Sequence, residues 1–354
     1  YVKAPGSTYG TLRVSNETTP PRTGTVLPWL GNGTAGGQTA GSILDVTPTT
    51  PAGYLMGHWV EVRDSGGTLK GTWRIGSISA SRVTLTPNSV GETIVLTAGD
   101  KWQGVYRFDT VTVPNGELIT STDPIRLGVN GVVNLTGPTG SGYLELPWEV
   151  TGTDVTVTGN VSVAAVTATN VTVATGSKLT HPAGSKLTLA VSGTLQVNGE
   201  IDVTGRGYGP GANATYPGAG AAVAYGGGSH MGQGWGNTNP LATFGSVYRA
   251  SEAGGGATSG VGGGVVRIDA VNGTVVINGA IRANGSGTGA GAGAGGSIWL
   301  TAGVLSGTGV VEAKGGVPPG ANNGGGGGGA VSIEYLGGAG LGTNQMLANG
   351  GKGC

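Results

Sequence analysis

Short stretches of alternating apolar and polar residues recur along the second half of the chain. The two clearest, "GTLQVNGEIDVTG" at residues 193–205 and "GTVVINGAIRANG" at 273–285, place apolar residues at every second position on both sides of an Asn-Gly pair. A looser third copy, "GVLSGTGVVEAKG", occupies residues 303–315. Period-two alternation predicts two short β-strands in each copy, with the apolar residues on one buried face.

Two structures fit this repeated phrase. Each copy could be an ordinary β-hairpin, because Asn-Gly is the strongest short signal for a hairpin turn. Three features favour one turn of a parallel β-helix instead: another short apolar strand precedes each copy, the strands are too short for a free-standing hairpin, and loops of unequal length separate the copies. Those glycine-rich loops are residues 206–264, 286–296 and 316–329.

The β-helix interpretation makes a specific prediction about register. Equivalent positions of successive copies should pair in parallel, so that Leu195, Val275 and Leu305 form one internal file. The long glycine runs between the copies should then lie side by side as extended segments or remain mobile. Residues 151–205 carry the same strand pattern without long glycine-rich loops, so the β-helix is expected to begin there or earlier.

Residues 25–104 have a different pattern. Conventional amphipathic strands such as "GHWVEVRD" and "RVTLTP" predict a small inserted β-barrel or sandwich, with a core supplied by Trp59, Trp73 and Trp102. The chain is therefore expected to be all-β. Its predicted parts are a first β-helix turn at 1–24, the insertion at 25–104 and a parallel β-helix at 105–354.

The two ends of the sequence read as parts of the same repeat. "GTNQMLANGG" from Gly342 aligns with "GTGVVEAKGG" from Gly307, and "YVKA" at residues 1–4 resembles the strand that would follow. The expected partners are thus copies of this chain, or adjacent repeat units, stacked head to tail into a filament. The residues expected at the two assembly ends are Tyr1, Val2, Leu12, Val14, Met346 and Leu347.

Residues from about 150 to 354 resemble the glycine-rich β-helical modules of giant bacterial surface proteins of adhesin type. The motifs that carry the resemblance are "YGGGSHMGQGWG", "FGSVYRASEAGGGATSGVGGGVVRI", "GTVVINGAIRANG", "GAGGSIWLTAGVLSGTGVVEAKGG" and "GGGGGGAVSIEY". The resemblance implies a parallel β-helix in an extracellular, cell-surface protein. It implies no catalytic residues.

Composition narrows the range of functions. The chain has 18 basic and 18 acidic residues among 354, so no overall electrostatic field would collect nucleic acid or anionic lipid. It has 77 glycines, about three times the average usage, without the strict period of collagen. No apolar run is long enough for a membrane-spanning helix. The single cysteine, Cys354, is at the last position.

The sequence contains few candidates for catalytic residues. The closest carboxyl pair, Glu200 and Asp202, belongs to the repeat, where Asp202, Arg282 and Glu312 should form an exposed ladder of alternating charge. Neither a calcium-binding pattern nor histidines with metal-site spacing are present, so no cofactor is expected, and structural calcium is not indicated. The isolated histidines are His58, His181 and His230, of which His230 is expected to lie solvated in a glycine loop.

The excursion at 206–264 is the best candidate for contact with a ligand or partner, because aromatic residues concentrate there. Their rings could stack on sugars or bury a partner, or they could clamp the glycine segments onto the stack. These residues are Tyr208, Tyr216, Tyr225, Trp235, Phe244 and Tyr248. The expected function is an adhesive, structural surface module and not an enzyme. The alternatives are a carbohydrate-binding or carbohydrate-active β-helix, and ice binding by threonine rows such as "VTVTG".

Overall fold

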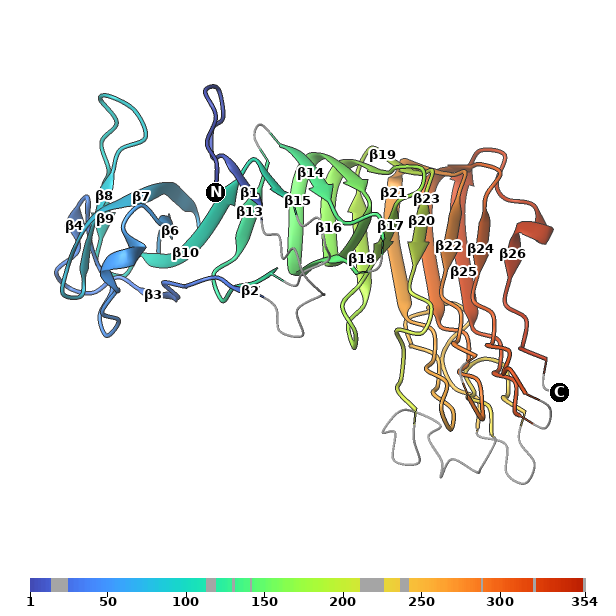
Figure 1. Ribbon diagram of the computed structural model, residues 1–354. Coiled ribbons are helices and arrows are strands. Elements are labelled where there is room, and N and C mark those ends of the chain that lie inside the picture. The colour runs from blue at the N-terminus through green and yellow to red at the C-terminus, as the bar shows by residue number, and fades with distance from the viewer. Residues whose placement is uncertain are drawn as a thin grey trace. The chain divides into compact units, whose positions relative to one another are not determined.

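The protein is all-β in the computed structural model, apart from two single-turn 3₁₀ helices among the described residues, Gly53–Leu55 and Thr343–Gln345 (Figure 1). The chain forms two compact units. Unit 1 comprises Tyr1–Leu12, Arg22–Asp109 and Ile119–Gly128, and unit 2 comprises Arg13–Pro21, Thr110–Leu118 and Val129–Cys354. The structure describes residues 1–13, 25–112, 119–128, 131–140, 142–210, 226–235, 242–287, 289–320 and 323–352. Unit 1 therefore extends beyond the expected insertion at 25–104.

Unit 1 contains a nine-stranded sheet in the order β13-β10-β6-β7-β8-β5-β4-β9, with β3 paired to β10. Neighbouring strands of this sheet run antiparallel, except for the parallel pair β10–β13. The strands are β3 (Asn32–Thr34), β4 (Ala40–Gly41), β5 (Ile43–Asp45), β6 (Trp59–Arg63), β7 (Leu69–Ser79), β8 (Arg82–Thr86), β9 (Leu96–Thr97), β10 (Lys101–Phe108) and β13 (Ile125–Leu127). The short strands β1 (Thr11–Arg13), β2 (Thr25–Val26) and β12 (Ile119–Thr120) lie outside this sheet.

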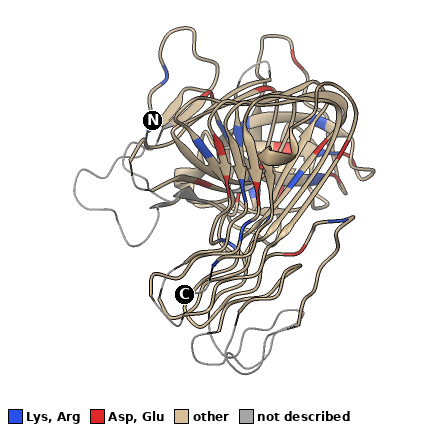
Figure 2. Ribbon diagram, turned by 90° about the vertical axis from the view of Figure 1, so that its right-hand side faces the viewer, with Lys and Arg blue, Asp and Glu red and all other residues tan. Residues whose placement is uncertain are grey.

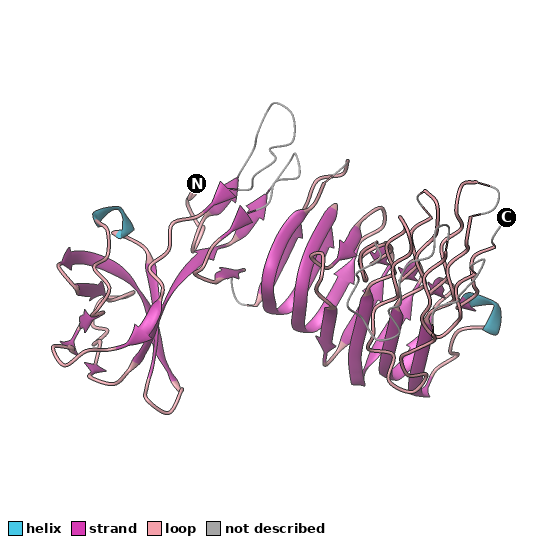
Figure 3. Cartoon of the chain, turned by 90° about the horizontal axis from the view of Figure 1, so that it is seen from below, coloured by secondary structure: helices cyan, strands magenta, loops and turns pink. Residues whose placement is uncertain are grey.

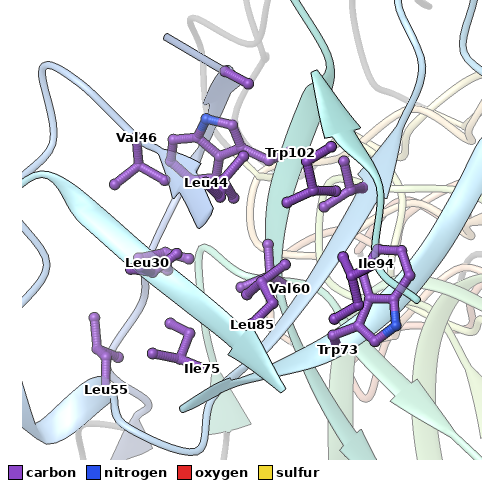
Figure 4. Packing of buried hydrophobic residues seen from close by; sticks show 14 residues of the cluster. Leu30, Leu44, Val46, Leu55, Val60, Trp73, Ile75, Leu85, Ile94 and Trp102 are labelled. Atoms are coloured by element: carbon purple, nitrogen blue, oxygen red, sulfur yellow. The ribbon is translucent and has the colours of Figure 1, made fainter. Parts of the chain in front are cut away.

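Alternation along the strands of unit 1 sorts its side chains between core and surface. In β6, Val60 and Val62 are fully buried, whereas Trp59 and Glu61 on the other face are only partly buried. Trp73 and Trp102 lie in the core with Leu44, as expected (Figure 4). The prediction that Trp59 supplies the core is wrong, because period two places it on the face opposite Val60.

Unit 2 consists of parallel strand ladders. Its paired strands are β11 (Thr110–Thr112), β14 (Val132–Thr136), β15 (Leu144–Thr158), β16 (Asn160–Val173), β17 (Lys178–Thr180), β18 (Leu187–Val191), β19 (Thr194–Val197), β20 (Glu200–Asp202), β21 (Val265–Ile277), β22 (Ala280–Arg282), β23 (Ser297–Ser306), β24 (Val310–Glu312), β25 (Ala330–Gly337) and β26 (Met346–Leu347). The pairs that link β14 onward are all parallel in the described ladders. We call this set of strands the parallel stack.

The register of the parallel stack matches the repeat in the sequence. Leu195 pairs with Val275 and Val275 with Leu305, and all three side chains are fully buried, which confirms the predicted internal file. The hairpin alternative is wrong, because β19 pairs with β16 and β21 and not with β20. At the far end, Met346 pairs with Val311, as the alignment of the two glycine-threonine phrases predicts.

Between passes through the parallel stack, the chain enters long extended segments that lie side by side (Figure 3). Their described residues belong to no β-ladder apart from one isolated bridge, Gly291–Gly324, yet their backbones bond to one another. We call the described residues 226–235, 254–264, 289–296 and 324–329 the glycine bundle. The glycine runs thus lie side by side, which was one of the two outcomes expected from the sequence.

Candidate functional site

The glycine bundle is held together by backbone groups. Gly228 donates to the carbonyl of Ala292 at 2.9 Å, Ala292 donates to Gly324 at 2.9 Å, and Gly327 donates back to Gly228 at 2.8 Å. These bonds join three segments that are far apart in sequence. Most of the glycines here are buried, and the bundle carries almost no charged side chains (Figure 2).

Close backbone packing explains why these segments require glycine. A Cβ atom on Gly293 would meet the carbonyl group of Val261, and a Cβ on Gly295 would meet that of Ala313. In both cases the obstacle is a backbone carbonyl, which cannot rotate away as a side chain can. The bundle is therefore a closely packed layer in which side chains fit only at selected positions.

The aromatic residues expected to form a contact surface separate into two groups. Phe244 lies 5.0 Å from the ring of His230 and 6.4 Å from that of Tyr208, so these rings pack on the bundle, as the clamp alternative proposed. Trp235 and Tyr248 instead present 49% and 80% of their surface to solvent. Tyr216 and Tyr225 lie outside the described residues.

Trp235 is exposed although its backbone is fixed in the bundle. Its amide donates to the carbonyl of Gly325 at 2.9 Å, and its carbonyl accepts from Gly227 at 2.8 Å. The carbonyl of Tyr248 accepts a hydrogen bond from the hydroxyl of Ser332 on β25 at 3.1 Å. Both rings thus project from an ordered backbone, which lowers the entropy cost of binding a ligand.

His230 corrects one expectation: it is fully buried, not solvated. Its Nδ1 lies 2.8 Å from the carbonyl oxygen of Gly295, an arrangement that makes Nδ1–H the donor, while Nε2 has no hydrogen-bond partner among the described residues. Burial lowers the pKa of His230, because a protonated ring at this position would be a cation without contact with water. The residue is thus a neutral structural element of the bundle.

His181 has a similar environment at the end of β17. It is fully buried, its Nδ1 lies 2.8 Å from the carbonyl of Pro182, and its pKa is lowered by burial and by the charge of Arg206. His58 in unit 1 is also buried and pairs with Asp123 at 2.8 Å. In the described part of the chain, no three His, Cys, Asp or Glu residues form a group that could hold a metal ion.

The carboxyl pair of the repeat belongs to a charged ladder on β17, β20, β22 and β24. Asp202, Arg282 and Glu312 pair in register, as predicted. Arg282 Nε donates to Glu312 at 2.8 Å, and Lys178 Nζ donates to Asp202 at 2.7 Å. The ladder is less exposed than expected, since Glu312 is 8% exposed and packs between basic side chains.

Electrostatics agree with a structural role for this ladder. Burial alone would raise the pKa of Asp202, but the hydrogen bonds from Lys178 and Thr204 outweigh it and hold that pKa below its usual range. Burial would also raise the pKa of Glu312. Hydrogen bonds from Lys314, Asn284 and Arg282 outweigh this effect and lower that pKa. Both carboxylates are thus ionised ion-pair partners at neutral pH, without the raised pKa of a general acid.

The residues expected at the assembly ends have distinct surroundings. Met346 and Leu347 form β26 on the parallel stack and are half-buried. In unit 1, Val2 forms an antiparallel bridge with Thr11, and Tyr1 and Val2 are 61% and 67% exposed. Leu12 is half-buried in β1, and Val14 lies outside the described residues, as does Cys354.

One cluster of aromatic and arginine side chains in unit 1 was not predicted from the sequence. Tyr9 and Trp59 meet edge to face at 5.5 Å, Arg107 lies 4.0 Å over the ring of Tyr9, and Arg74 lies 4.7 Å over Trp59. The alternation in "WVEVR" could have placed Trp59 on the outer face. No local pattern could have placed Tyr9 beside it, because these residues come together only through tertiary pairing.

Comparisons with known proteins give no match, either to a protein-family model, to a curated protein or to a solved structure. The described residues include no helix with the length and apolar character needed to cross a membrane.

Proposed function

We propose that this chain is a non-enzymatic structural and adhesive module of a bacterial cell surface, whose unit 2 is a parallel β-helix. The single observation that carries the proposal is the pair of exposed rings in unit 2, Trp235 on the closely packed glycine bundle and Tyr248 on a segment bonded to β25. An adhesin needs a stiff scaffold and a few projecting contact residues, and unit 2 offers both.

The register of the strands supports the β-helix. Each pass contributes equivalent positions to parallel ladders, for example Val150, Val166, Leu189, Ile268 and Leu300 in successive strands. These side chains are buried along one line. A solenoid of this kind is stabilised by nearest-neighbour contacts and grows by addition of turns.

The exposed aromatic side chains support the adhesive role. Aromatic rings carry a large share of the energy in sugar and protein contacts, and they do so best on a preorganised backbone. Because the bundle is nearly uncharged, its ligand would be recognised by stacking and hydrogen bonding. A neutral surface polysaccharide has that chemistry.

End-to-end assembly is part of the proposal. Turns added at β26 would continue its ladder through backbone hydrogen bonds, as in strand addition to a sheet edge. The added turns would come from a second copy or an adjacent repeat unit. Such a chain of units would form a fibre or stalk outside the cell.

A binding screen tests the adhesive role. The purified chain is applied to immobilised neutral plant and bacterial polysaccharides, with release of reducing ends measured in parallel. We expect binding without release, and a loss of at least about tenfold in affinity for the Trp235→Ala/Tyr248→Ala variant. Tyr335→Ala is the matched control, because it removes another exposed ring of unit 2, 46% exposed on β25, that is not part of the proposed contact pair.

The screen can contradict the proposal in two ways. Release of reducing ends would assign the chain to the carbohydrate-active enzymes. Equal binding by the double variant and the wild type would remove Trp235 and Tyr248 from the contact surface. Electron microscopy addresses assembly separately, since a monodisperse monomer at high concentration would exclude fibre formation by free chains.

A further inference from the structure

The missed cluster in unit 1 lies between two adjacent surface hollows. Their volumes are about 260 and 460 Å³, and both are lined by Tyr9, Trp59, Arg74 and Arg107. The smaller hollow also includes Tyr54, which is 75% exposed. Together they offer a site lined by both aromatic rings and guanidinium groups.

The guanidinium groups of Arg74 and Arg107 pack on aromatic rings and form no contact with a carboxylate among the described residues. Arg107 lies 4.0 Å over Tyr9 and 5.6 Å from Trp59, and Arg74 lies 4.7 Å over Trp59. Among the described residues, neither guanidinium has an ion pair or a side-chain hydrogen bond. A stacked guanidinium keeps its planar edge of N–H donors free, and that edge matches a carboxylate in bidentate geometry.

The acidic residues nearby are already committed to other partners. Asp109 accepts hydrogen bonds from the backbone amides of Tyr9 and Gly10 at 3.0 and 2.9 Å. Asp123, fully buried, accepts from the amides of Leu30 and Gly31 and pairs with His58. These carboxylates hold residues around the hollows, and none of the described acidic residues forms an ion pair with Arg74 or Arg107.

The wall of the smaller hollow is held in place by a ring contact and a hydrogen bond of Tyr106. His58 meets the ring of Tyr106 edge to face at 4.6 Å, and the hydroxyl of Tyr106 donates to the carbonyl of Pro28 at 2.5 Å. Burial and the charge of Asp123 raise the pKa of Tyr106 to about 12, so this donor stays protonated. A ligand therefore meets a site that is already formed.

We propose that these hollows bind an acidic oligosaccharide, with its carboxylate on Arg74 and Arg107 and a sugar ring against Tyr54. An exposed tyrosine beside a cationic edge suits a ring that is apolar on its face and charged at its rim. Balanced overall charge disfavours a nucleic acid, which needs a wide basic surface. The site is separate from the adhesive surface proposed for unit 2.

Titration calorimetry of the full chain with a short uronic acid oligosaccharide tests this inference. We expect saturable binding that weakens with added salt, and binding at least about tenfold weaker for the methyl ester of the same oligosaccharide, because esterification removes the charge. Arg107→Gln and Arg74→Gln should each weaken binding of the acid by about tenfold without changing binding of the ester.

Arg63→Gln is the matched control, since Arg63 is an exposed arginine of unit 1 that pairs with Glu61 outside the hollows. Thermal melting of each variant verifies that it is folded. Equal binding of acid and ester, an equal loss in Arg63→Gln, or no binding of the acid would each overturn the inference. Unchanged binding by Trp235→Ala/Tyr248→Ala would show that this site acts independently of the proposed adhesive function.

Discussion

The parallel stack and the glycine bundle are built by the same passes of the chain, but different groups hold each of them together. In residues 289–306, the chain runs through the bundle and then enters β23 without a break. Within β23, Ile298 and Leu300 are buried by side-chain packing, whereas Gly293 and Gly295 are buried against backbone carbonyls. One region therefore depends on the presence of side chains and the other on their absence.

This difference predicts opposite responses to a change in side-chain volume. The stack should be damaged by removing atoms, because a buried apolar side chain leaves a cavity when it is truncated. The bundle should be damaged by adding atoms, because a new Cβ must displace backbone.

The largest effect is expected for Leu300→Ala in the stack. Leu300 is fully buried and pairs in register with Ile268 and Ile333. Truncation should lower the free energy of unfolding of unit 2 by about 2–5 kcal/mol, measured by urea titration. Val304→Ala on the same strand is the control, since Val304 is 41% exposed and should change stability by less than about 0.5 kcal/mol. Similar losses for both would contradict the side-chain core.

A smaller and more local effect is expected for Gly293→Ala in the bundle. The new methyl group would meet the Val261 carbonyl, at a cost of about 1–3 kcal/mol. Hydrogen exchange should speed up at the amides of Gly316 and Ala294, whereas the amides of β23 should stay protected. Gly209→Ala should leave exchange unchanged, since a Cβ there meets nothing within 4 Å. If β23 lost protection to the same extent, the two regions would not be independent.

The sequence allowed the stack to be predicted better than the bundle. Alternation placed Leu195, Val275 and Leu305 on one line, because period two is a local property that each strand repeats. Glycine runs have no such period, so the partners of Gly228 and Gly327 could not be deduced. The cluster of Tyr9 with Trp59 was missed for the same reason, since only tertiary structure brings them together.

Mild acid should loosen the bundle around His230. The pKa of His230 is lowered in the folded chain, so between that pKa and the unfolded value of about 6.5 the unfolded state binds more protons. Stability from this group is thus fully present above about pH 6.5 and is lost as the pH falls through the folded pKa. Hydrogen exchange at pH 7 and pH 5 should show faster opening of bundle amides at pH 5.

Substitution of the histidine provides the control for that pH effect. His230→Gln cannot take up a proton, so it should reduce the difference between pH 7 and pH 5 even if it is less stable at both. His181 is also buried with a lowered pKa, and it should account for part of the remaining slope. An unchanged pH dependence in His230→Gln would assign the acid response to other groups.

The smallest effect is expected in the charged ladder on the surface of the stack. Glu200 is 39% exposed at its side chain and bonds to Arg282, which also pairs with Glu312. In Glu200→Gln, Arg282 keeps its second partner, so no buried charge is left alone and the loss should be at most about 1 kcal/mol. High salt should reduce this loss further, whereas the nearly uncharged bundle should not respond to it. Urea titrations of both proteins at low and high salt measure the difference. A loss above about 2 kcal/mol that persists in high salt would mean that the ladder acts as a buried network, and that unit 2 depends on charge as well as on packing.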